Sequence, residues 1–358
     1  MKKVIRYIGS KEKLIDFLQE KIFEEFKNSK IRFFDGFSGS TFVSKYCQEN
    51  FNWNISLSDI SKYTEILTSR LNINNCSLEV IKIAEETQYE EGTTGIISKE
   101  FSLSGKPETY SKDFFKMNGP RGYFTKEVGN KIDNMRDKAI SLYKDNKINT
   151  DELNLMLMVA IAFADKNANT TSVYGAYLKN QSRETRYIKE DFFNVLIKEK
   201  HNNLNKVNFI SGSILESLEK IEYMDVIYLD PPYNTRRYES NYHILNYIAD
   251  IDFNTAHIKF DSKTGLPFKT VENQFGSKKG TKLIFEEMIK LAVKKGKYVF
   301  ISYSTDGEMS VDNIIDICKK HNIIYEIYYK DYKRFKASKI ETNNKELKEI
   351  IFKLKDNV

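Results

Sequence analysis

The sequence predicts an α/β fold with a mostly parallel sheet, an antiparallel carboxyl-terminal end and an inserted, mainly helical domain. Short apolar segments alternate with amphipathic helical segments at both ends of the chain, which is typical of a parallel sheet covered by helices. Residues 74–205 interrupt this alternation with stretches rich in Gly, Thr, Ser and Asn. The last two strand-like segments, 323–332 and 347–354, have too short a connection for a helical crossover, so we expect an antiparallel pair.

Length and composition indicate a globular protein with two structural units. The chain has 358 residues, of which 41% are hydrophobic, and it contains 22 Tyr and 24 Phe, which is too aromatic for a disordered chain. A net charge of +6 permits an anionic partner without demanding one. The three cysteines show no CxxC spacing, which indicates neither a zinc site nor disulfides. The unpaired cysteines fit a reducing cytoplasm, and we expect no metal. Without an apolar leader or membrane-length apolar segment, we expect a soluble protein with no membrane partner.

The first part of the sheet lies before the insert. Lys11 to Phe26 carries apolar residues at helical spacing and predicts an amphipathic helix. The other expected elements are strands over 31–35 and 54–59 and helices over 41–49 and 61–71. The turn at Gly36 to Ser40 separates the first strand from its helix, and Ser38 or Ser40 is suited to cap that helix.

The insert has a core of its own, because the helix expected over 151–165 is apolar all round. The alternation then resumes and is interrupted again by 252–280, which is rich in Lys, Gly and Asn and is expected to be a long surface loop. The remaining expected elements are strands over 207–210, 224–229 and 298–303, helices over 214–221, 240–251 and 283–293, and a helix through Cys318.

Asp230-Pro231-Pro232-Tyr233 follows the apolar strand 224–229, at the end where open α/β sheets place their ligands. Two consecutive prolines make a stiff corner, so backbone carbonyl oxygens there remain free to accept hydrogen bonds. A carboxylate, a carbonyl and an aromatic ring together suit the grip of a planar ring bearing an amino group, such as a nucleobase. The alternative is a plain turn in which Tyr233 is ordinary packing.

Phe37-Ser38-Gly39 follows the first strand, and an acid, Asp59, comes about 20 residues later. This layout suits adenosine, because the backbone approaches at glycine and the carboxylate accepts from the ribose hydroxyls. The segment lacks the G-x-G-x-x-G pattern of nicotinamide sites, and an ordinary strand-to-helix turn explains it equally well.

The order of these segments resembles that in Dam-like (D12 class, alpha-group) adenine-specific DNA methyltransferases of the Asp-Pro-Pro-Tyr type. The matching segments are Arg6 to Lys11, Asp35 to Gly39, Asp59, and Asp230 to Tyr233. The resemblance implies an S-adenosylmethionine-dependent (Rossmann-like) catalytic domain over 1–73 and 206–358. It implies target recognition by the inserted domain 74–205, with 252–280 as a second variable loop.

S-adenosyl-L-methionine is the cofactor that this resemblance implies. The implied cofactor-binding residues are Tyr7, Gly9, Lys11, Asp35, Phe37, Ser38, Gly39, Asp59, Ser213, Ile214 and Asp230. The chain departs from the family pattern at Thr41, which replaces the second glycine of F-x-G-x-G. It departs again at Ser213, which stands where an adenine-contacting Asp is common. The Ser213 hydroxyl or the backbone amide of Ile214 can supply that contact instead.

The implied activity is methyl transfer to the exocyclic N6 amino group of adenine in duplex DNA, with the base flipped out of the helix. The implied catalytic residues are Asp230, Pro231, Pro232 and Tyr233. We expect a monomer from a bacterium or phage, acting in a restriction-modification system beside an endonuclease or as a solitary methylase. Amino methylation of cytosine or RNA remains open. So does a catalytically silent nucleic-acid-binding relative, although an intact Asp230, Tyr233, Asp59 and Lys11 argue against it.

Basic residues near the catalytic motif and the last strands are expected to bind DNA. They are Arg236, Arg237, Lys333, Arg334, Lys336 and, in the insert, Lys179. The basic segment near 330–339 equally fits a solvated sheet edge. Arg121, Lys126 and Lys179 are expected to be surface residues that affect which DNA sequence is read, whereas His243 is expected to be structural.

Overall fold

The computed structural model describes residues 3–179, 184–202, 205–233, 238–253, 263–266, 275, 278–331 and 348–357. The predicted DNA contacts at Arg236, Arg237, Lys333, Arg334 and Lys336 lie outside the described residues, as does most of the 252–280 segment. The chain forms two compact units. The helical unit comprises Met1–Ser10, Ser61–Lys206 and Tyr238–Val271, and the sheet unit comprises Lys11–Ile60, Val207–Arg237 and Glu272–Val358.

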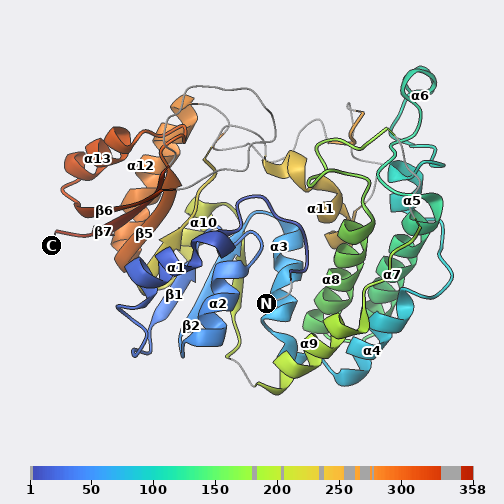
Figure 1. The fold of residues 1–358 in the computed structure, drawn as a ribbon, viewed down its shortest axis with the longest axis horizontal. Helices are drawn as coiled ribbons and strands as arrows, with labels where there is room; N and C mark the ends of the chain where they lie inside the picture. The colour runs from blue at the N-terminus through green and yellow to red at the C-terminus, as the bar shows by residue number, and fades with distance from the viewer. Residues whose placement is uncertain are drawn as a thin grey trace. The chain divides into compact units, whose positions relative to one another are not determined.

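The described part of the sheet unit contains a seven-stranded sheet with the order β3-β2-β1-β4-β5-β7-β6. Figure 1 labels β1, β2, β5, β6 and β7 of this sheet. The strands are β1 (Arg32–Asp35), β2 (Asn54–Asp59), β3 (Asn208–Ser211), β4 (Met224–Leu229), β5 (Gly296–Ser304), β6 (Ile324–Asp331) and β7 (Lys348–Lys355). Neighbours from β3 to β5 pair in parallel, whereas β7 pairs antiparallel with both β5 and β6. The mostly parallel sheet with an antiparallel carboxyl-terminal end is therefore confirmed.

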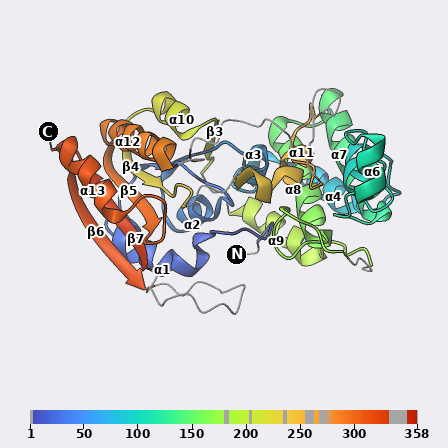
Figure 2. The same cartoon turned by 90° about the horizontal axis from the view of Figure 1, so that it is seen from above.

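Helices cover the sheet on both sides (Figure 2). Successive side chains of a strand point to opposite faces, so apolar residues of one strand pack against helices on both sides. Phe33 packs edge-on against Phe23, in the helical segment made of η1 (Lys11–Leu14), α1 (Ile15–Leu18) and η2 (Gln19–Phe23). Phe23 also stacks on Tyr46 of α2 (Phe42–Asn50). The neighbouring Phe34 belongs to the other core, which it shares with the helices α10 (Ile214–Lys220), α12 (Lys278–Lys295) and α13 (Val311–Lys320).

The central helix of the helical unit is α8 (Thr150–Asn167), whose side chains from Leu155 to Ile161 are all buried. Asn149 caps it by accepting a hydrogen bond from the Glu152 amide. The other helices of this unit are α3 (Lys62–Leu67), η3 (Thr68–Arg70), η4 (Ile73–Asn75), α4 (Leu78–Thr87), α5 (Ile96–Phe101), α6 (Lys112–Asn118), α7 (Lys126–Lys144), α9 (Glu190–His201), η5 (Tyr238–Asn241) and α11 (His243–Ala249). The all-round burial predicted for the helix over 151–165 is confirmed. No helix in the described ranges is long and apolar enough to cross a membrane.

The compact units divide the chain at different residues from those of the predicted domains. Tyr63, Ile66 and Leu67 of α3 lie in the hydrophobic core that contains α8, and so do Ile244 and Leu245 of α11. For this reason the segments 1–10, 61–73 and 238–271 belong to the helical unit. Periodicity shows that α3 has an apolar face, but it cannot show which helix that face meets.

The predicted side-chain cap of α2 by Ser38 or Ser40 is wrong. The capping position is Thr41, which has φ 60° and makes no capping side-chain hydrogen bond. Ser38 instead donates its hydroxyl hydrogen to the carbonyl oxygen of Ser58 at 3.0 Å. A positive φ favours glycine, so the position at which the family pattern has its second glycine keeps a glycine-like backbone here.

Candidate active site

The carboxyl ends of β1 and β4 lie side by side in the sheet unit. Asp35, the last residue of β1, is in register with Tyr228 of β4, and the Gly36 amide donates to the Tyr228 carbonyl at 2.9 Å. From β1 the sheet continues through β2 and β3, whereas from β4 it continues in the opposite direction through β5. Such a reversal is the point at which open α/β sheets bind their ligands.

The turn after β1 runs so close to neighbouring side chains that a side chain at its start would displace them. A Cβ at Gly36 would lie 2.6 Å from Leu229 Cδ2 and 2.8 Å from Ile214 Cδ1. Gly39 has φ 46°, and its amide donates to Asp59 Oδ2 at 2.9 Å. The structure thus brings the predicted glycine turn and the predicted ribose acid together.

Asp35 is 1% exposed at the end of β1. Its Oδ2 accepts a hydrogen bond from Ser44 Oγ at 2.7 Å, but its Oδ1 is buried and accepts none from the described residues. Burial raises the pKa of Asp35 to about 7, while the hydrogen bond from Ser44 opposes that rise. A buried carboxylate with an unused oxygen suits a cationic or hydrogen-donating ligand group.

The Asp-Pro-Pro-Tyr segment begins directly after β4 and contacts a buried lysine. Lys11 Nζ lies 2.9 Å from Asp230 Oδ1 and also donates to the Tyr233 hydroxyl. The same Tyr233 hydroxyl lies 3.0 Å from Asp230 Oδ1. All of these contacts to Asp230 are made through Oδ1. Among the described residues, its Oδ2 and the carbonyl oxygen of Pro231 accept no hydrogen bond.

Electrostatics keep this lysine charged and this aspartate easier to protonate than usual. Burial lowers the pKa of Lys11, but the charges of Asp230 and Glu349 outweigh that effect, and the pKa is raised overall. Burial raises the pKa of Asp230 to about 6, against the lowering effect of Lys11. Asp230 is therefore mainly ionised at neutral pH and becomes protonated in mild acid.

Glu349 of β7 belongs to this cluster, and sequence reasoning missed it. Its Oε1 lies 2.9 Å from Lys11 Nζ, 2.6 Å from the Tyr233 hydroxyl and 2.8 Å from Ser302 Oγ of β5. No motif surrounds Glu349, and 338 residues separate it from Lys11 along the chain. Only the pairing of β7 with β5 brings it to this end of the sheet.

The predicted adenine contact lies at the start of α10, where Ser213 caps the helix. Its Oγ accepts from the Glu216 amide at 3.4 Å, and its own amide donates to Glu216 Oε2 at 2.9 Å. Ile214 is the first residue of the helix, where backbone amides lack intrahelical acceptors. Phe37 is half-buried, and its ring meets Phe275 edge-on at 6.0 Å.

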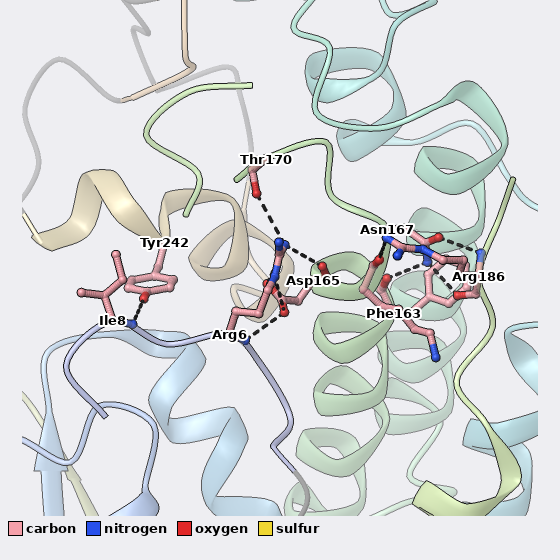
Figure 3. Close-up of polar contacts among 9 residues, drawn as sticks. Arg6, Ile8, Phe163, Asp165, Asn167, Thr170, Arg186 and Tyr242 are labelled. Carbon is pink, nitrogen blue, oxygen red and sulfur yellow. Dashed lines mark hydrogen bonds and ion pairs between the residues drawn. The ribbon is translucent and has the colours of Figure 1, made fainter. Parts of the chain in front are cut away.

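The amino-terminal segment that contains Tyr7 and Gly9 belongs to the helical unit. Figure 3 shows the contacts that its residues Arg6 and Ile8 make with Asp165 and Tyr242. The Arg6 amide donates to Asp165 Oδ2 at 2.9 Å, and the Ile8 amide donates to the Tyr242 hydroxyl at 2.8 Å. Tyr7 stacks on the Tyr242 ring at 5.2 Å, and Gly9 has φ 88°. The segment is thereby fixed to α8 and to Tyr242, the residue directly before α11.

Arg121 is not a surface residue, so that prediction is wrong. It is 0% exposed, and its Nη1 lies 2.6 Å from Glu100 Oε2, which is itself buried. Lys126 and Lys179 are exposed, as expected.

His243 is structural in the described part of the helical unit, because it is buried and its ring contacts the carbonyls of Ser240 and Thr264. Burial lowers the pKa of His243 to about 4, so it is neutral near pH 7.

Similarity to known proteins places this site in a family. Residues 7–300 match the model of the family described as D12 class N6 adenine-specific DNA methyltransferase. The chain is 32% identical over 363 residues to Type II methyltransferase M.FokI of Planomicrobium okeanokoites, an alignment of 99% of this chain but only 53% of that protein. It is 32% identical over 346 residues to Type II methyltransferase M.NlaIII of Neisseria lactamica, with 95% of each chain covered. It is 28% identical to Type II methyltransferase M.CviAII of Paramecium bursaria Chlorella virus 1, with 97% of each covered. Because the family model spans the glycine turn, the ribose acid and the Asp-Pro-Pro-Tyr corner, the chain belongs to the D12 class of N6 adenine-specific DNA methyltransferases.

Proposed function

We propose that this chain transfers a methyl group from S-adenosyl-L-methionine to the N6 amino group of an adenine flipped out of duplex DNA. One observation carries the proposal. The Asp230 carboxylate stands at the reversal of strand order, where its Oδ1 contacts Lys11 and where no described residue donates a hydrogen bond to its Oδ2. Family membership supports the base and the polymer on which the site acts.

The residues at the ends of β1 and β2 fit this cofactor. The unpartnered Oδ1 of Asp35 suits its positively charged part, and the Asp59 carboxylate suits the ribose hydroxyls. Ser213 and Ile214 at the start of α10 are proposed to contact its adenine, and Tyr7 and Gly9 to border its methionine part. When bound, the cofactor supplies a methyl group that its sulfonium makes electrophilic.

The protein's own contribution is to orient the amino group and to stabilise charge. The nitrogen lone pair of adenine is delocalised into the ring, so the group must become pyramidal before it can attack. Asp230 Oδ2 and the Pro231 carbonyl are proposed to accept one hydrogen bond each from the two N–H groups of the amino group. These hydrogen bonds favour the pyramidal geometry and stabilise the developing positive charge. Tyr233 is proposed to stack on the flipped base.

The test is a methylation assay on duplex DNA with labelled cofactor, followed by digestion and identification of the modified nucleoside. We expect N6-methyladenine. Methylcytosine alone would contradict the assigned base, label in RNA alone would contradict the assigned polymer, and DNA binding without any product would identify a silent relative.

DNA recognition is proposed to reside in the helical unit, with 252–280 as a second variable segment. Lys126 and Lys179 are exposed there and suit contact with DNA, and Arg236, Arg237, Lys333, Arg334 and Lys336 are proposed to contact phosphates. Relatives named as Type II methyltransferases support pairing with a restriction endonuclease in a bacterial or phage-infected cytoplasm. We propose that the chain acts as a monomer.

Asp59→Ala is expected to raise the Kd for S-adenosylmethionine about tenfold to a hundredfold. A hydrogen bond to a charged group contributes about 1.5–3 kcal/mol, and this variant also removes the acceptor that holds the Gly39 amide. Isothermal titration calorimetry measures the Kd. The control is Glu222→Ala, which removes an exposed carboxylate of the same unit. Equal affinity of Asp59→Ala and wild type would remove Asp59 from the cofactor site.

A further inference from the structure

The cluster beside the Asp-Pro-Pro-Tyr corner contains a carboxylate to which the reaction proposed above gives no role. Glu349 lies on β7, and its side chain is 4% exposed. Its Oε1 receives hydrogen bonds from Lys11 on η1, from Tyr233 after β4 and from Ser302 on β5. Donors from three separate parts of the sheet unit therefore converge on one buried oxygen.

Counting hydrogens shows how fully this arrangement is determined. An ammonium group has three hydrogens, and Lys11 contacts three acceptors: Asp230 Oδ1, Glu349 Oε1 and the Tyr233 hydroxyl. A phenol has one hydrogen, and the Tyr233 hydroxyl lies closer to Glu349, at 2.6 Å, than to Asp230, at 3.0 Å. The Tyr233 hydrogen therefore points to Glu349, and each donor of the cluster is used.

This geometry fixes the orientation of the catalytic carboxylate. Asp230 Oδ1 is held by Lys11, and Lys11 is in turn held by Glu349. The Cβ of Asp230 is held by the backbone, and its Cβ, Cγ and two oxygens lie in one plane. Once Oδ1 is held, the direction of Oδ2 is therefore also determined. Without Glu349, Lys11 and Tyr233 would lose the acceptor that they share.

We propose that Glu349 is a positioning residue for methyl transfer, which holds Lys11 and Tyr233 so that Asp230 presents its second oxygen to the amino group. The proposal rests on the function proposed above for Asp230, and it assigns Glu349 no contact with substrate. Ser302 supports Glu349 from the neighbouring strand, with its hydroxyl as a donor.

Charge provides a readout that a merely structural residue would not move. Among the described residues, the titratable groups facing Asp230 are Lys11 from η1, Glu349 from β7, and Tyr233. Asp35 from β1 and Tyr228 from β4 also interact electrostatically with it. Lys11 lowers the pKa of Asp230 and Glu349 raises it. Neutralising Glu349 removes the repulsion between its negative charge and that of Asp230, while the attraction between Lys11 and Asp230 remains. The pKa of Asp230 is therefore expected to fall.

The test is Glu349→Gln, with Glu326→Gln as its matched control on the exposed part of β6. We expect kcat to fall about tenfold to a hundredfold with little change in KM, which is the usual effect of losing a group that orients a catalytic residue. We also expect the acid limb of the pH profile of kcat to move to lower pH. The control is expected to keep the wild-type kcat and the wild-type acid limb.

A second measurement needs no methyl transfer. The carboxyl carbon of Asp230, labelled with ¹³C and assigned by its loss in Asp230→Asn, reports its titration directly by NMR. We expect its midpoint to be lower in Glu349→Gln than in wild type. Failure of wild type to methylate adenine would refute the proposed function and leave this result standing, so the two failures are distinguishable.

Two outcomes would overturn the inference. One is a Glu349→Gln variant with wild-type kcat and an unmoved Asp230 titration. The other is a variant whose kcat falls only in proportion to the fraction of protein that is folded, while the acid limb of the kcat profile and the NMR titration midpoint of Asp230 both stay at their wild-type pH. If Glu349→Gln does not fold, Ser302→Ala is the second variant, since it removes a single donor to Glu349. It is expected to lower kcat by a smaller factor, and an unchanged kcat in folded Ser302→Ala would count against the proposal.

Discussion

Asp230→Ala is expected to lower kcat by about three orders of magnitude while the protein stays folded and binds DNA. The loss follows because the variant removes the acceptor proposed to hold the amino group and stabilise its developing charge, and a single such group contributes about 10²–10³ in rate. Folding survives because Lys11, which would otherwise be left as an unpaired buried cation, still contacts Glu349 at 2.9 Å. Single-turnover methylation and thermal unfolding measure the two effects.

The control for this variant is Asp312→Ala, which removes an exposed carboxylate from the first turn of α13. We expect its single-turnover rate to equal that of wild type. A wild-type rate for Asp230→Ala would end the proposed mechanism. An unfolded Asp230→Ala would show instead that Glu349 alone cannot compensate the charge of Lys11.

Arg121→Met is expected to destabilise the protein by about 3–5 kcal/mol, because it leaves the Glu100 carboxylate buried without its cation. The arginine side chain is 0% exposed and that of Glu100 is 1% exposed, so water cannot replace the lost contact. The Arg121 guanidinium also lies 4.1 Å from the centre of the Tyr110 ring, and this cation–π contact would be lost as well. Urea unfolding measures the free-energy difference.

Lys126→Met is the matched control, since it removes a cation from the exposed first turn of α7. We expect it to change the free energy of unfolding by no more than about 0.5 kcal/mol. The double variant Glu100→Gln/Arg121→Met is expected to recover part of the lost stability, because it no longer buries an unpaired charge. If Arg121→Met had wild-type stability but altered which DNA site is methylated, Arg121 would contribute to sequence recognition despite its burial, and the expected loss of stability would be refuted.

The sheet could be predicted from the sequence because its strands are short apolar segments whose boundaries are marked locally. The apolar strand 224–229 and the following prolines place Asp230 at the carboxyl end of a strand without any three-dimensional information. The glycine turn at Gly36 to Ser40 is also marked locally, although the side chains that crowd Gly36, Ile214 and Leu229, come from distant parts of the chain.

What the sequence could not show depends on contacts between distant residues. Glu349 has no motif around it, and its role depends on the register of β7 against β5, which no local pattern encodes. Arg121 stands among Gly and aromatic residues, as a DNA-binding arginine also does. Its burial depends on Glu100, which is supplied by a separate helix. Charged residues are seldom buried, so the surface was the default expectation for Arg121.

The helical unit is assembled from three separate stretches of chain, and this constrains how new specificities can arise by recombination. A crossover that exchanged only 74–205 between relatives would separate Tyr63 and Leu245 from the α8 residues with which they share a core. In most such hybrids, core residues from two different relatives would have to pack against one another. Lineages with this architecture are therefore expected to diversify by point substitution within an intact core, or by joint exchange of 1–10, 61–206 and 238–271, rather than by exchange of one continuous segment.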